Sequence, residues 1–161
     1  MASYSFKTIW RLEAPIDRVY DAIEDSLAWP TWWPMVRAVE EVAPGDADGL
    51  GSVRRYVFST RLLYTLSFDS VLTRRERPVA LAGEARGELE GIGAWSLAES
   101  DGWTIVRYDW NIRTTRPWMN LLAPLPFVDG IFRLNHHAVM RDGLRGIRRL
   151  LGVRGEYARL A

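Results

Sequence analysis

The sequence predicts an α+β protein in which one antiparallel sheet of about seven strands is covered by a long C-terminal helix. Three observations predict this fold: residues 3–13 alternate apolar and polar side chains, further alternating segments fill residues 36–115, and residues 129–151 place apolar side chains at helical spacing. Short connections between the alternating segments favour antiparallel pairing. A sheet of this size has an apolar face that must be buried, and residues 129–151 form the only expected element long enough to cover it.

The first part of the chain is expected to form a strand, a short helix and an aromatic corner. Residues 3–13 follow a period of two, with Ile9 as the only exception. Pro15 suits the first position of a short helix, and the buried face of that helix would combine Ile16, Val19, Tyr20 and Ile23. The segment 29–34, WPTWWP, holds at most one helical turn between its prolines, so we interpret it as a compact aromatic corner.

The middle of the chain is expected to be a meander of strands. The turn at 44–51, PGDADGLG, is rich in residues that favour chain reversal. Four glycines within 83–93 favour sharp curvature of the sheet rather than phosphate binding. The expected strands cover residues 36–42, 52–60, 64–73, 79–87, 89–98 and 103–115.

The sequence leaves open which face of strand 52–60 is buried. If Val53, Arg55 and Val57 point inward, Arg55 enters the interior; if Tyr56 and Phe58 do, it does not. The greater apolar area of two aromatic rings favours the second alternative, which makes Tyr56 a possible hydrogen-bond donor. An inward arginine is suited to orient a carboxylate or an enolate, although most of the strand arginines are expected to be solvated: Arg54, Arg55, Arg61, Arg107 and Arg113.

The long helix at 129–151 is predicted to be amphipathic. At about 100° per residue, one stripe contains Val128, Phe132, His136, Val139, Met140, Gly143, Gly146, Ile147 and Leu150. Gly143 and Gly146 would let the helix approach its neighbours closely. We therefore expect residues 143–151 to be a packing half and residues 132–140 to face a cavity, while the arginines opposite the stripe are solvated.

Composition excludes several functional classes. A chain of 161 residues is expected to be one domain over 1–161, and its net charge of +1 gives no case for nucleic-acid binding. The absence of cysteine removes thiol nucleophiles and zinc–thiolate sites. His136 and His137 differ by about 100° around the helix axis, so they cannot share one metal ion, and no metal or cofactor is expected. Eight tryptophans are many for a core of this size unless some line an unfilled space.

The sequence also bears on membranes. The N-terminal segment alternates and carries charges, unlike a signal peptide, so a cytoplasmic protein is expected. The uncharged run 117–128 is too short for stable membrane insertion. Residues 117–127 have two interpretations, a buried connector or an apolar lid that contacts membranes transiently.

Several of these features together resemble the START-like helix-grip superfamily (SRPBCC), in its bacterial polyketide cyclase/dehydrase-type branch. The resemblance covers nearly the whole chain. It rests on the opening strand followed by APIDRVY at 14–20, the WPTWWP corner at 29–34, the late strand ending in Trp110, and a closing helix with NHH at 135–137 and MR at 140–141.

The resemblance implies a strongly curved sheet that grips the C-terminal helix around a deep apolar cavity, a START-like ligand-binding domain. Ligands of such proteins are lipids, sterols, polyketides and other hydrophobic molecules, and some relatives are aromatase/cyclases. We therefore expect a carrier or binding protein for a hydrophobic small molecule. The alternative is a polyketide cyclase, aromatase or dehydratase that uses polar cavity residues as acid and base, although no such pair can be placed residue by residue.

His136 and Tyr56 are the catalytic candidates, because an imidazole titrates near neutral pH. A buried histidine satisfied by a structural partner is the competing interpretation. The oligomeric state is left open. The expected ligand contacts combine aromatic residues of the sheet with residues of the long helix: Trp33, Tyr56, Phe58, Tyr64, Phe68, Trp95, Tyr108, Trp110, Trp118, Phe132, Asn135, His136, Val139 and Met140.

Overall fold

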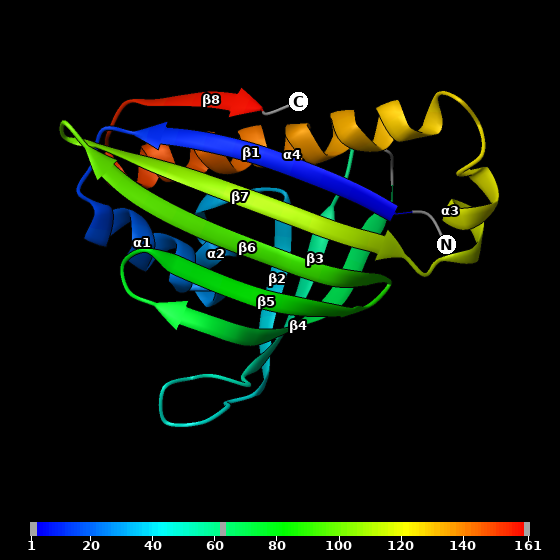
Figure 1. The fold of residues 1–161 in the computed structure, drawn as a ribbon, viewed down its shortest axis with the longest axis horizontal. Coiled ribbons are helices and arrows are strands. Elements are labelled where there is room, and N and C mark those ends of the chain that lie inside the picture. Colours follow the sequence, from blue (N-terminus) through cyan, green and yellow to red (C-terminus); the bar gives the residue numbers. More distant parts are fainter. Residues whose placement is uncertain (1–2, 62–63, 160–161) are drawn as a thin grey trace.

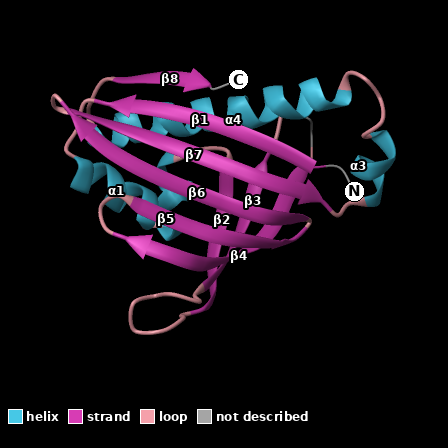
Figure 2. Ribbon diagram, in the orientation of Figure 1, coloured by secondary structure: helices cyan, strands magenta, loops and turns pink. Residues whose placement is uncertain are grey.

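The computed structural model describes residues 3–61 and 64–159 (Figures 1 and 2). Its elements in chain order are β1 (Ser3–Leu12), α1 (Ile16–Glu24), the 3₁₀ helix η1 (Ser26–Ala28), α2 (Trp29–Trp32), β2 (Val36–Ala43), β3 (Val53–Ser59), β4 (Thr65–Glu76), β5 (Ala80–Gly87), β6 (Leu89–Ser100), β7 (Trp103–Thr114), α3 (Pro117–Leu122), α4 (Val128–Leu151) and β8 (Gly155–Arg159).

The described strands form one sheet in the order β2-β3-β4-β5-β6-β7-β1-β8, and every neighbouring pair is antiparallel. Helix α4 lies along one face of this sheet, with α1 and α2 near one end and α3 at the other (Figure 1). The predicted fold class is confirmed, including all seven expected strands. The expected number of about seven is one too low, because the five-residue strand β8 pairs with the free edge of β1.

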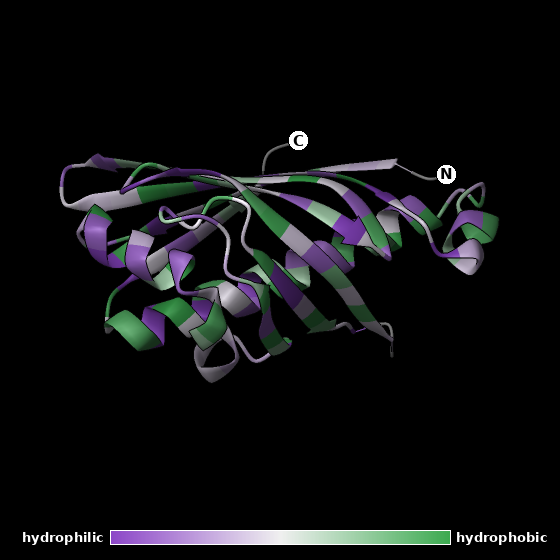
Figure 3. Cartoon of the chain, turned by 90° about the horizontal axis from the view of Figure 1, so that it is seen from below, coloured by the Kyte–Doolittle hydropathy of each residue, from purple (hydrophilic) through white to green (hydrophobic). Residues whose placement is uncertain are grey.

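Glycines allow the sheet to curve strongly around the helix (Figure 3). Gly91 has a φ of 146°, and a Cβ atom there would lie 2.1 Å from the carbonyl oxygen of Asn111. Gly83 and Gly93 are directly paired across β5 and β6, so two side chains are missing from the same place on the inner face. Bulges in the β2–β3 and β4–β5 pairs bend the sheet further.

The aromatic corner at 29–34 anchors the C-terminal half of α4. The indole N–H of Trp33 donates to the carbonyl of Val139 at 3.0 Å. Gly143 lies against the Trp33 ring, and a Cβ atom on Gly146 would lie 1.8 Å from the carbonyl oxygen of Trp32. These contacts show the close approach that the two glycines predicted.

Two positions on α4 differ from the predicted stripe. Leu150 is exposed, whereas Leu144 is buried, because α4 is packed between the sheet and α2 and its buried face is broader than one stripe. His137, on the flank about 100° around the helix from His136, is buried and hydrogen-bonded to the hydroxyl of Tyr157 on β8. The unpredicted strand therefore covers that flank. None of the described helices is long and apolar enough to cross a membrane.

Candidate ligand-binding site

A cavity of about 320 Å³ lies between the inner face of the sheet and α4. Thirteen of the fourteen side chains predicted as ligand contacts line it, and Trp118 is the exception. The wall is mainly apolar and rich in aromatic residues, which come from alternating positions of several strands, among them Tyr56 and Phe58 on β3 and Tyr108 and Trp110 on β7. These four rings are only partly buried although they point into the fold, because part of their surface faces the cavity.

The structure settles the face of β3. Tyr56 and Phe58 point inward, and Arg55 points outward to an ion pair with Asp69 at 2.8 Å. Arg54 is two residues before Tyr56 and shares the inner face with it. Alternation along the strand places Arg54 on the same face as Tyr56 and Phe58, so the sequence contained this signal. The prediction asked only whether Arg55 points inward and did not single out Arg54.

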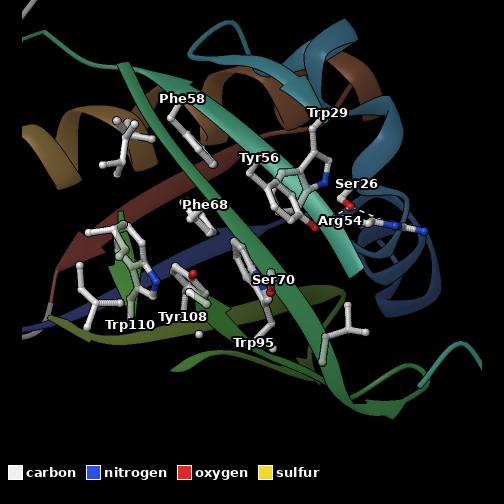
Figure 4. Close-up of a pocket in the computed structure, with 18 of the residues that line it drawn as sticks. Ser26, Trp29, Arg54, Tyr56, Phe58, Phe68, Ser70, Trp95, Tyr108 and Trp110 are labelled. Atoms are coloured by element: carbon white, nitrogen blue, oxygen red, sulfur yellow. Dashed lines mark hydrogen bonds between the residues drawn. The ribbon is translucent and has the colours of Figure 1, made fainter. Parts of the chain in front are cut away.

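A polar cluster occupies one end of the aromatic wall (Figure 4). Arg54 donates through Nη1 to the hydroxyl of Ser26 at 2.7 Å and to the carbonyl of Glu24 at 3.1 Å. The hydroxyl groups of Ser26 and Tyr56 are 2.8 Å apart. Burial raises the pKa of Tyr56, so its hydroxyl keeps its proton at neutral pH. Sequence reasoning did not identify Ser26, because it lies in η1 and far from β3 in the chain.

The cavity reaches the protein surface beside this polar cluster. The exposed lining residues Glu41, Pro44 and Arg75 come from β2, the β2–β3 loop and β4. Arg75 forms an ion pair with Glu24, which also lines the cavity. The polar cluster therefore lies near an opening.

The opposite end is covered by α3. Met119 of α3 is buried and lines the cavity, whereas Trp118 is 40% exposed and lies edge-on against Tyr64 with 5.3 Å between ring centroids. Trp118 does not line the cavity although Met119 does, because consecutive residues of a helix point in different directions. Trp118 instead packs behind a lining residue. The side-chain oxygen of Asn135 accepts a hydrogen bond from the backbone N–H of Arg61 at 3.1 Å, which ties α4 to the β3–β4 connection.

His136 lies in the cavity wall as an uncharged imidazole. Its ring stacks on Phe6 with centroids 4.3 Å apart, and its Nε2 atom is 3.4 Å from the hydroxyl of Thr8. Burial, together with the positive charge of nearby His137 and Arg133, lowers the pKa of His136 to about 3. At neutral pH this ring is therefore a neutral imidazole, and it is a weak base.

Tyr108 places a second hydroxyl in the cavity. A Cβ atom on Gly93 would lie 2.7 Å from that hydroxyl oxygen, so the missing side chain at Gly93 makes room for it. Burial raises the pKa of Tyr108, and no described side chain is hydrogen-bonded to its hydroxyl. Tyr108 is therefore a protonated donor available to a ligand.

No group of three or more histidine, aspartate or glutamate side chains within residues 3–61 and 64–159 is arranged to hold a metal ion. The polar atoms of the cavity are instead hydroxyls, a guanidinium and a neutral imidazole. This set of groups is suited to hydrogen-bonding an oxygen atom of an otherwise apolar molecule.

Comparison with protein families matches residues 6–152 to the family described as "Polyketide cyclase / dehydrase and lipid transport". The chain belongs to this family. The predicted resemblance is thereby confirmed, and membership of this family supports a role in hydrophobic ligand binding or in cyclisation without deciding between them. No curated protein matches the chain significantly.

Solved structures show the same fold at low sequence identity. The di-domain ARO/CYC protein BexL is 19% identical with a TM-score of 0.70, and the match covers 88% of this chain and 48% of BexL. The chain thus spans about half the length of BexL. A START superfamily protein from Mycobacterium smegmatis is 15% identical, with a TM-score of 0.69 and coverage of 93% of this chain and 97% of the other. The Zhui aromatase/cyclase from Streptomyces sp. R1128 is 17% identical, with a TM-score of 0.68 and coverage of 94% and 93%.

Proposed function

We propose that the protein binds an apolar small molecule in the cavity between the sheet and α4, as a carrier or binding protein. The observation that carries the proposal is the aromatic wall whose rings keep part of their surface open inside the fold. Water in contact with such a wall is displaced favourably by an apolar ligand. The cavity volume of about 320 Å³ is at the lower end of the range of small-molecule sites.

The ionisable groups of the cavity favour binding over proton-transfer catalysis. The lowered pKa of His136 leaves it as the neutral imidazole at neutral pH, so it has no imidazolium proton to donate as a general acid and is a weak base. The raised pKa values of Tyr56 and Tyr108 keep both hydroxyls protonated, so they donate hydrogen bonds rather than act as bases.

A cyclase, aromatase or dehydratase is the second candidate function. The observation that favours it is the chain of hydrogen bonds from Arg54 through Ser26 to Tyr56, which is suited to polarise a ligand carbonyl. The family description and the aromatase/cyclase neighbours are compatible with it.

Ligand uptake tests the first proposal. The neutral fluorophore N-phenyl-1-naphthylamine is titrated into the purified protein, and bound material is extracted into organic solvent for mass spectrometry. We expect saturable uptake. Val139→Trp, which fills the cavity from α4, should weaken uptake about 10-fold or more, whereas Leu150→Trp on the exposed side of the same helix should not.

The same extraction separates the two candidates. A carrier returns the bound molecule chemically unchanged, whereas a cyclase or dehydratase converts a poly-β-ketone thioester into a product that has lost water. Absence of uptake by the wild-type protein would refute the binding proposal. Turnover that is abolished in Tyr56→Phe would establish the enzymatic one.

We also propose that the protein contacts lipid bilayers transiently through an apolar tip, defined as seven exposed side chains around α3 and the start of α4: Trp118, Leu121, Leu122, Leu125, Phe127, Ile131 and Leu134. Among the described residues, these make up seven of the twelve large exposed apolar side chains. Asp129 and Arg133 are the only charged residues in the stretch 117–134, and they are paired with each other. Helix α3 lies at one end of the molecule (Figure 1), and a tip that is apolar and has no net charge fits a neutral lipid surface.

A further inference from the structure

Arg54 is a cation in the cavity wall, and it has no anionic partner among residues 3–61 and 64–159. Its neighbour Arg55 is paired with Asp69 on the outer face of the sheet. Arg75, which also lines the cavity, is paired with Glu24. No carboxylate of the described residues forms an ion pair with Arg54, so the positive charge of this guanidinium is not neutralised within that part of the chain.

The hydrogen bonds of Arg54 are also incomplete. A guanidinium has five N–H donors. Nη1 is used twice, to the carbonyl of Glu24 and the hydroxyl of Ser26, but Nε is buried and has no acceptor in the described part of the chain. A buried cationic donor without an acceptor is unfavourable. An anionic ligand group would both neutralise the charge of Arg54 and accept a hydrogen bond from it.

Ser26 and Tyr56 extend the donor set from Arg54 into the aromatic part of the cavity. Arginine can only donate, so the Ser26 oxygen accepts from it and can pass its own hydrogen to the Tyr56 oxygen, 2.8 Å away. In that order the Tyr56 hydroxyl hydrogen is available to a ligand. A cation at the start of such a chain strengthens each following hydrogen bond.

The side chains around Arg54 indicate how a ligand with an anionic group would lie in the cavity. In Figure 4, Arg54 and Ser26 lie at one end of the labelled side chains, and the rings of Phe58, Phe68 and Trp110 lie farther along the wall. The uncharged His136 is on the aromatic side, and adds no second positive charge there. The partly buried guanidinium of Arg54, unpaired among the described residues, therefore lies at one end of the cavity, and the aromatic side has no charged group facing it from His136.

We propose that the ligand is a hydrophobic organic acid whose carboxylate accepts hydrogen bonds from Arg54 and Tyr56, with its apolar part lying along Phe58, Phe68 and Trp110. The inference rests on the proposed function, because it specifies the chemical class of the molecule that the cavity binds. Charge-assisted hydrogen bonds between arginine and carboxylate are among the stronger polar contacts in proteins. Neutral lipids of equal length lack the matching group.

The test compares three ligands that share one alkyl chain: dodecanoic acid, dodecan-1-ol and methyl dodecanoate. Each displaces N-phenyl-1-naphthylamine from the full chain near neutral pH, where the carboxylic acid is ionised. We expect the acid to bind about 10-fold or more tightly than either neutral ligand, the size of effect that one charge-assisted hydrogen bond supplies.

Two neighbouring arginines provide a matched pair of variants. Arg54→Gln should weaken binding of the acid and reduce its preference over dodecan-1-ol to within about 3-fold. Arg55→Gln, on the outer face of the same strand, should keep the full preference. A far-UV circular dichroism spectrum like that of the wild type shows that Arg54→Gln is folded. If that variant does not fold, Tyr56→Phe replaces it and should lower the preference about 3-fold or more.

The outcomes distinguish failure of the acid-binding inference from failure of the proposed function. If no ligand displaces the fluorophore or binds to the wild-type protein, the proposed function itself fails. If the alcohol and the ester bind as tightly as the acid, or if Arg54→Gln and Tyr56→Phe both keep the preference, the cavity still binds apolar molecules and only the acid-binding inference is overturned.

Discussion

His136 illustrates how burial changes the chemistry of a single side chain. The sequence identifies it by type and by its place on the helix, and an isolated imidazole would titrate near neutral pH. In the fold the ring stacks on Phe6 and has lost most of its water, which lowers its pKa to about 3. The neutral form is therefore the one that the native state holds.

This burial predicts an acid-dependent loss of stability. The unfolded chain takes up a proton on His136 as the pH falls below about 6.5, whereas the native state does not do so until about pH 3, so the free energy of unfolding decreases over that interval. His136→Gln removes this contribution. Between about pH 6 and pH 4, urea denaturation should show the wild type losing roughly 1 kcal/mol per pH unit more than the variant. Parallel pH profiles would contradict the low native pKa.

The residues of the cavity wall could be predicted largely from alternation along strands. Tyr108 and Trp110 on β7 and Phe68 on β4 were expected in the cavity and line it. The polar cluster could not be predicted in the same way. Ser26 and Arg54 are 28 residues apart and meet only because η1 packs beside β3, which is a tertiary contact with no periodic signal.

At the scale of elements, α4 is fixed by close contacts that only glycine permits. Gly146 lies under the carbonyl of Trp32, and Gly143 lies under the Trp33 ring. The helical pattern and its glycines were sufficient to predict this half of the helix as a packing surface. Strand β8 was not predicted, because GEYAR is short, begins with glycine and gains its stability from the free edge of β1.

Gly146→Ala should destabilise the fold. The added methyl group would lie 1.8 Å from a backbone oxygen, so α4 and the corner must move apart at a cost of about 1–3 kcal/mol or more. Gly130→Ala is the matched control, since it lies in the same helix with open space around it, and alanine there should stabilise by up to about 1 kcal/mol. Urea midpoints measure both. Equal midpoints for the two variants would show that the close approach is not a constraint in solution.

At the scale of the whole molecule, the two ends of the cavity differ in chemistry. The end beside the β2–β3 loop has charged and hydroxyl groups, and the end beneath α3 is closed by Met119 and bordered outside by the apolar tip. Under the proposed function, a ligand with a polar head and an apolar body matches this arrangement. The sequence indicated that residues 117–127 form either a connector or a lid, and the exposure of Leu121 (79%) and Phe127 (61%) favours contact with an external apolar surface.

Vesicle binding tests that contact at the level of the intact protein. Because the tip carries no unpaired charge within residues 117–134, co-sedimentation with phosphatidylcholine vesicles should be detectable and insensitive to added salt. Leu121→Ser with Phe127→Ser removes two of the most exposed apolar side chains and should weaken binding about 10-fold or more. Val79→Ser with Leu150→Ser makes the same kind of change at two exposed residues away from the tip and should bind as the wild type does. Equal binding by both double variants would refute membrane contact at the tip. A concentration-dependent dimer in sedimentation that only Leu121→Ser with Phe127→Ser abolishes would instead assign the tip to a second copy of the chain.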